Sequence, residues 1–144
     1  MEVGKRLLYE IDTANRVLPL VRAIVRDVVN DFRVLRGAGR QQRALQAHHD
    51  GDAETLSRIG KLSDQVDEVS SRIEGYLREL EELGIELRDL ETGSVDFPTI
   101  MNGLPAFLCW RLGEEEVAWW HAANTGFADR QRLPERVRSG LSLT

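Results

Sequence analysis

Residues 59–83, IGKLSDQVDEVSSRIEGYLRELEEL, carry the pattern that decides the fold. Apolar side chains recur here in alternating steps of three and four residues, which is the spacing of one helix face and of a coiled-coil seam. The members of the seam are Ile59, Leu62, Val66, Val69, Ile73, Tyr76, Leu80 and Leu83. The pattern predicts a long helix over residues 54–83, which Gly84 ends.

A second long helix is predicted upstream, over residues 13–36. Its apolar positions are Val17, Val21, Ile24, Val28, Phe32 and Leu35. Asp12 or Thr13 supplies the N-cap, and Pro19 is expected in the first turns, where a missing N–H costs least. Gly37 and Gly39 are expected to end this helix, and HHDGD at residues 48–52 to form a turn. Two long helices with a short polar connection should pack as an antiparallel hairpin.

After Gly84 the pattern alternates, which predicts a β-meander over residues 85–121. In GIELRDLETGSVDFP, residues 84–98, a turn at Glu91-Thr92-Gly93 places Arg88 opposite Asp96. A short strand is predicted over residues 6–11 and a loosely ordered tail over residues 130–144. The fold class is therefore α+β, a long antiparallel helical hairpin packed on a small, mainly antiparallel sheet.

The stretch CWRLGEEEVAWWH, residues 109–121, holds all three tryptophans and the one cysteine of the chain. As a hairpin that turns at Glu114-Glu115, it pairs Leu112 with Val117, Trp110 with Trp119, and Leu108 with His121. These six residues are expected to form the core face. The opposite face then carries Phe107, Cys109, Arg111, Ala118 and Trp120, and it needs a cover or a partner.

This second face is the predicted ligand site. Arginines bind carboxylate or phosphate groups, and aromatic rings stack on the molecule that carries them. The candidate ligand-binding residues are Arg111, Trp120, Phe107, Cys109, Arg130 and Asp96. His121 is a candidate metal ligand with nearby carboxylates, although a half-buried structural histidine is the alternative. Cys109 and His121 are expected on opposite faces, so Cys109 is interpreted as a buried structural thiol.

Composition excludes several classes of protein. The chain has 144 residues and a net charge of −5, and it contains no apolar run long enough to span a bilayer. Residues 1–50 hold nine basic and six acidic side chains, and residues 51–103 hold five and thirteen, with no dense basic run. Nucleic-acid binding is therefore not expected. With one cysteine and no visible secretory signal, the sequence predicts a cytoplasmic protein without an internal disulfide.

Several pieces of the sequence together resemble a family of small bacterial proteins, domain-of-unknown-function family 2203. They are YEIDTANRVLPLVR (9–22), GIELRDLETGSVDFP (84–98), and CWRLGEEEVAWWH (109–121) followed by TGFADR (125–130). The similarity spans most of the chain, with a variable segment within residues 37–55. It implies bacterial origin and a small standalone protein, and it brings no activity or cofactor.

The functional expectation is a non-catalytic ligand-binding or protein-interaction module. The helical seam favours a homodimer, and the face of Arg111 favours a small anionic ligand or a protein partner, without a membrane. The alternative is a small metal-dependent enzyme that uses His121 with nearby carboxylates. The loop at His48-His49-Asp50 has no assigned role.

Overall fold

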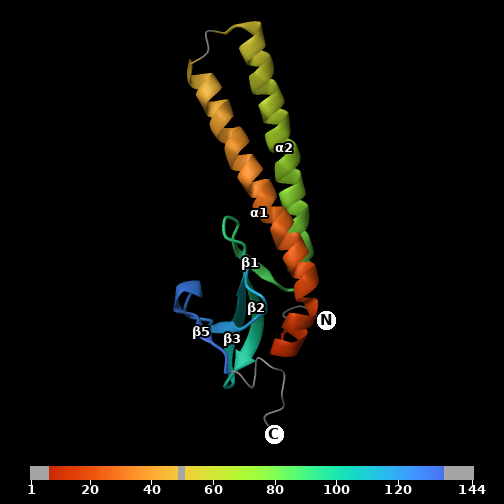
Figure 1. The fold of residues 1–144 in the computed structure, drawn as a ribbon, viewed down its shortest axis with the longest axis vertical. Helices are drawn as coiled ribbons and strands as arrows, with labels where there is room; N and C mark the ends of the chain where they lie inside the picture. Colours follow the sequence, from red (N-terminus) through yellow and green to blue (C-terminus); the bar gives the residue numbers. More distant parts are fainter. Residues whose placement is uncertain (1–6, 49–50, 135–144) are drawn as a thin grey trace.

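The structure, a computed structural model, describes residues 7–48 and 51–134. Two helices, α1 (Ile11–His48) and α2 (Ala53–Glu82), precede an antiparallel sheet with the strand order β1-β2-β3-β4-β5. The strands are β1 (Glu86–Asp89), β2 (Ser94–Met101), β3 (Leu104–Arg111), β4 (Trp119–Ala122) and β5 (Gln131–Arg132), with a 3-10 turn, η1 (Phe127–Asp129), before β5. The predicted α+β class, with a helical hairpin on an antiparallel sheet, is confirmed (Figure 1).

Helix α1 is longer at both ends than the sequence predicted. It begins at Ile11, so Pro19 lies well inside the helix and not in its first turns. The prediction that Gly37 and Gly39 end the helix is wrong, since α1 continues to His48. A glycine inside a helix costs roughly 0.5–1 kcal/mol but does not break it, and Ala38 between the two glycines is buried. The following residues are good helix formers, and α2 runs alongside them.

The predicted strand over residues 6–11 is also wrong. Residue 6 lies outside the described residues, residues 7–10 are not a strand, and α1 starts at Ile11. One backbone hydrogen bond, from the Tyr9 N–H to the carbonyl of Pro98 at 2.8 Å, holds this segment beside β2. The alternation of Leu7, Tyr9 and Ile11 therefore reflects packing of a short extended segment.

Helix α2 agrees with its prediction within one residue at each end. Asp52 caps it by accepting a hydrogen bond from the Thr55 N–H at 2.7 Å, and Gly84, with φ of +74°, follows its last turn. Arg72 joins the two helices by donating to both carboxylate oxygens of Asp31, at 3.1 and 3.2 Å. The end of the hairpin, residues 33–48 of α1 and 53–67 of α2, projects beyond the sheet (Figure 1). We call this part the arm.

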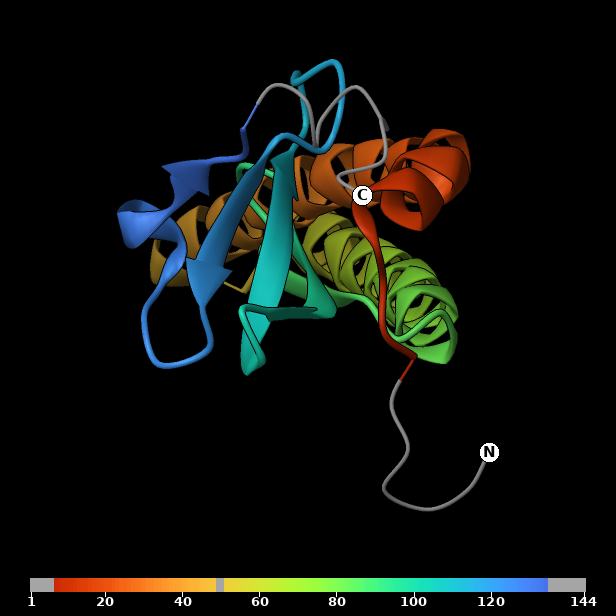
Figure 2. The ribbon, with the colours of Figure 1, turned by 90° about the horizontal axis from the view of Figure 1, so that it is seen from below.

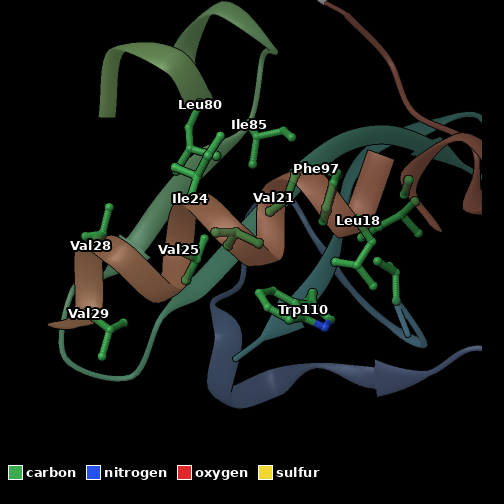
Figure 3. Close-up of a cluster of buried hydrophobic side chains, with 14 of the residues drawn as sticks. Leu18, Val21, Ile24, Val25, Val28, Val29, Leu80, Ile85, Phe97 and Trp110 are labelled. Atoms are coloured by element: carbon green, nitrogen blue, oxygen red, sulfur yellow. The ribbon is translucent and has the colours of Figure 1, made fainter. Parts of the chain in front are cut away.

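The hydrophobic core lies between one face of the sheet and the hairpin (Figure 3). Trp110 and Phe97 are fully buried there, against Val21 and Val25 of α1. Figure 2 shows both long helices on this side of the sheet, with neither over the opposite face, which we call the outer face. Among the described residues, no helix combines the length and the apolar character needed to cross a membrane.

The β1–β2 turn approaches α1 so closely that Gly93 has no room for a side chain. Its φ is +76°, and a Cβ atom would lie 2.8 Å from Val25 Cγ1 and 3.0 Å from Leu112 Cβ. Gly103, in the β2–β3 turn, has a similar φ of +80° but open space around it. A substitution at Gly103 therefore tests the backbone strain alone, whereas the same substitution at Gly93 adds a clash in the core.

We predict that Gly93→Ala destabilises the protein more than Gly103→Ala. Both variants place a Cβ on a left-handed residue, at about 1–2 kcal/mol. Only Gly93→Ala also overpacks the core, at a further 1–3 kcal/mol or so. Urea unfolding of the two variants measures the difference, and equal losses would contradict the contact between this turn and α1.

Candidate functional site

The outer face of the sheet collects polar side chains from its three central strands. The β2–β3 register sets Asp96 opposite Cys109, and the β3–β4 register sets Phe107 opposite His121. Because side chains alternate along a strand, these four residues point to the side away from the helices. Asp96, Cys109 and His121 are nearly inaccessible, at 1%, 0% and 3% exposure.

The predicted register of the last hairpin is wrong by one residue. The structure pairs Leu108 with Trp120 and Cys109 with Trp119, where the sequence predicted Leu108 with His121. A slip of one residue moves every side chain of a strand to the other face. Trp119 and His121 therefore lie on the outer face, and Trp120 packs against the core.

Three expectations that depended on the predicted register are therefore wrong. In the structure Cys109 and His121 lie on the same face, Arg111 and Trp120 lie on different faces, and Trp119 is not a core residue. The remaining assignments hold, since Leu108, Trp110 and Val117 are buried in the core and Arg111 is exposed. The physical reason is the connection, which leaves β3 after Arg111 and enters β4 at Trp119 and so is wider than a two-residue turn.

Asp96, Cys109 and His121 form a compact cluster. One potential ligand atom from each side chain, an oxygen, a sulfur and a nitrogen, lies within 4.8 Å of the others. His121 Nδ1 donates to the carbonyl of Ala122 at 2.8 Å, and Nε2 lies 3.1 Å from Asp96 Oδ2. The other carboxylate oxygen, Asp96 Oδ1, is buried and has no hydrogen-bond partner. We call these three residues the DCH cluster.

The thiol of the cluster has an unusual environment. Burial raises the pKa of Cys109, and the nearby carboxylate of Asp96 raises the pKa further. Its Sγ lies 3.7 Å from the carbonyl oxygen of Phe107, and a hydrogen bond with the Asp96 side chain contributes to the raised pKa. The isolated protein therefore holds a neutral thiol here, which is a poor nucleophile.

Arg88 covers the cluster from the β1 side. Its Nε donates to Asp96 Oδ2 at 2.8 Å, so the two side chains share a face as expected, but the predicted pairing of Arg88 with Asp96 is wrong because the backbone partner of Asp96 is Glu86. An irregularity between Leu87 and Asp89 accounts for the difference. The guanidinium lies 5.2 Å from the ring centroid of Phe107. Arg88 and Phe107 also line a surface hollow of about 540 Å³, which the three cluster residues themselves do not line.

Arg130, a predicted ligand-binding residue, is occupied within the protein. Two of its nitrogens donate to the carboxylate of Glu114, at 3.2 and 2.6 Å. The guanidinium also lies 4.4 Å from the ring centroids of both Trp119 and Phe127. Arg130 thus fastens the segment before β5 to the β3–β4 connection. The sequence shows an acidic run at residues 114–116 and Arg130 shortly after Gly126-Phe127, but it gives no reason to pair the two.

The other candidates are dispersed. Arg111 lies at the rim of the outer face, 5.7 Å from the ring centroid of Phe127, and its backbone N–H donates to Glu114. His48 is exposed at the end of α1, at the tip of the helical hairpin that lies far from the sheet. His49 and Asp50 lie outside the described residues. Of the predicted site residues, the structure brings together Asp96, Phe107, Cys109 and His121.

We predict that Arg130→Lys lowers the free energy of unfolding by about 1–3 kcal/mol, because lysine cannot reproduce two parallel hydrogen bonds in a buried setting. Arg132→Lys is the matched control, since Arg132 is exposed and contacts only Trp119 among these rings, at 5.3 Å. Its loss should stay below about 0.5 kcal/mol. Thermal melts compare the two, and an equal effect would show that Arg130 is not structural.

Comparison with known proteins agrees with the similarity of the sequence pieces. The model of the family described as Uncharacterized conserved protein (DUF2203) matches residues 7–133, which include the whole DCH cluster and the Glu114–Arg130 pair. No curated protein and no solved structure matches the chain. Since the match covers most of its length, the chain belongs to the DUF2203 family.

Proposed function

We propose that the protein binds a divalent transition-metal ion at the DCH cluster. The observation that carries this proposal is the contact between His121 Nε2 and Asp96 Oδ2 at 3.1 Å. The carbonyl of Ala122 can only accept, so Nδ1 donates to it and Nε2 is the ring nitrogen that faces the carboxylate. Nε2 is therefore placed as a metal ligand beside Oδ2, which also accepts from Arg88 Nε at 2.8 Å.

The remaining atoms of the cluster favour a metal ion over a proton in that position. A proton shared by His121 and Asp96 leaves Asp96 Oδ1 buried and unpartnered, at a cost of about 1–3 kcal/mol. A metal ion can use the carboxylate, the imidazole and the thiolate at once, and coordination deprotonates a thiol outright.

The ligand set fits zinc or a similar ion. Imidazole nitrogen, thiolate sulfur and carboxylate oxygen bind Zn²⁺ at about 2.0–2.3 Å, which sets tetrahedral ligands on the order of 3.5 Å apart. The cluster atoms lie within 4.8 Å of one another, with Nε2 and Oδ2 3.1 Å apart, so adjustments on the order of 1 Å would bring them to that spacing. The bond from Nδ1 to a backbone carbonyl is the outer contact that zinc-bound histidines commonly make.

Three protein ligands leave one tetrahedral position for water or another ligand. Structural zinc sites use four protein ligands, whereas catalytic sites keep one position open. Arg88 and Phe107 lie between the hollow and the buried cluster, so a small molecule in the hollow would reach that position by displacing one of these two side chains. The expected binding module and the metal-dependent alternative thus converge on one site, with the metal ion as the bound ligand.

The experiment is a cobalt titration of protein freed of metal with a chelator. We expect one Co²⁺ per chain and a thiolate-to-cobalt charge-transfer absorption, which Zn²⁺ displaces. Cys109→Ser should abolish the absorption. Asp96→Asn and His121→Asn should weaken binding by more than the 10–100-fold that loss of an outer contact costs.

Ser94→Ala is the control, because Ser94 is buried on the same strand and face as Asp96 and hydrogen-bonds Thr92 at 2.8 Å. It should bind cobalt as the parent does, and circular dichroism should show every variant folded. If the parent protein binds neither ion, or if Cys109→Ser binds as tightly with an unchanged spectrum, the proposal is wrong.

The raised pKa of Cys109 predicts a pH dependence. At neutral pH the metal-free protein holds a protonated thiol, so metal binding releases its proton. The affinity should fall by about tenfold for each pH unit of acidification, for one proton released. Calorimetry in buffers of different ionisation enthalpy counts the proton, and Cys109→Ser should lose this slope. A pH-independent affinity would exclude the thiolate as a ligand.

A further inference from the structure

The face that α1 turns toward the sheet changes its character where the sheet ends. Val21, Val25 and Val29 are buried along it, and the last two lie against Gly93 of the β1–β2 turn. With 3.6 residues per turn, the same face continues along the arm with arginines. They are Arg33, Arg36, Arg40 and Arg43. We call these four residues the arginine stripe.

Two adjoining hollows follow the arginine stripe, of about 340 and 420 Å³, and Arg36 and Arg40 line both. Arg36 binds the carboxylate of Glu91 at 2.6 Å, so this surface already accepts one acidic group. Within residues 7–48 and 51–134, no other member of the stripe makes an ion pair. Among the described residues, Arg33, Arg40 and Arg43 therefore present positive charge without an ion-pair partner.

Helix α2 carries the complementary charge at the same level of the arm. Asp64 and Asp67 are exposed, one to either side of Val66 in the sequence, while Val66 itself lines the hollow with Arg40 and Arg43. Glu74 continues the same side of α2 toward the sheet. We call Asp64, Asp67 and Glu74 the acidic stripe.

The apolar seam of the arm is incompletely covered by its own two helices. Val69 and Ile73, nearer the sheet, are buried, whereas Leu35, Leu62 and Val66 of the arm are only partly buried. Two helices alone shield one side of each seam, and four helices enclose it from all sides. A second helical hairpin would therefore complete the core of the arm.

We propose that two copies of the chain pair through their arms, so that the arginine stripe of each copy lies on the acidic stripe of the other. A two-fold axis relates the two copies and makes both contacts equivalent. The pairing does not involve the DCH cluster and is independent of metal binding.

Sedimentation velocity of the full chain at micromolar concentration tests the proposal through exchanged charges. The parent protein should sediment as a dimer, and added salt should weaken it. Arg40→Glu with Arg43→Glu, and separately Asp64→Arg with Asp67→Arg, should each sediment as monomers, with the dimer Kd raised roughly a hundredfold or more by like charges. An equimolar mixture of the two variants should restore the dimer.

Arg16→Glu with Arg26→Glu is the matched control, because it makes the same change of charge on α1 below the arm and should leave the dimer intact. Circular dichroism should show the helical content of the parent in all variants. A monomeric parent would overturn the proposal, even if it bound a polyanion such as nucleic acid. Variants that stay dimeric, or a mixture that stays monomeric, would overturn it equally.

Discussion

The composition of the outer face depends on the residue at which β4 begins, because that residue sets the register between β3 and β4. Because side chains alternate, a shift of one residue would remove His121 from the side of Asp96 and Cys109. Contacts from the helix hold the connection before β4 in place. Asn15 of α1 accepts from the Val117 N–H at 2.7 Å and donates to the Val117 carbonyl at 3.4 Å, and Arg22 donates to the carbonyl of Glu115 at 2.9 Å. The helix that builds the core thus also selects the residues of the DCH cluster.

Burying the polar side chains of the DCH cluster costs folding free energy, and the fold offsets this cost in two ways. On the core face, Trp110, Phe97 and the valines of α1 supply apolar burial that is independent of the polar groups. On the outer face, Arg88 offsets the charge of Asp96, and the Glu114–Arg130 pair between Trp119 and Phe127 closes the opposite side. A buried carboxylate oxygen without a partner is rare in natural proteins, and such groups commonly indicate a functional role or a ligand.

Features fixed by short-range patterns were predictable from the sequence. The spacing of Val69, Ile73 and Leu80 predicted α2. The turn at Gly93 predicted that Arg88 and Asp96 share a face, where their side chains form a hydrogen bond. The end of α1 was not predictable from Gly37 and Gly39, because the penalty of a helical glycine is small beside the packing of a partner helix that local sequence does not show. The same holds for residues 7–10, where one bond to Pro98 replaces a strand.

The members of the DCH cluster were visible in the sequence, but their assembly was not. Asp96, Cys109 and His121 each attracted notice by residue type, and a two-residue turn at Glu114-Glu115 then put Cys109 and His121 on opposite faces. The sequence did place a glycine, Gly113, just before that turn. In the structure its φ is +107°, and the chain bends there before it reaches Glu114. The width of the connection, however, depends on Asn15, which precedes Val117 by 102 residues. A contact at that separation decides whether a thiol and an imidazole face each other, so the chemistry of this face is a property of the tertiary structure.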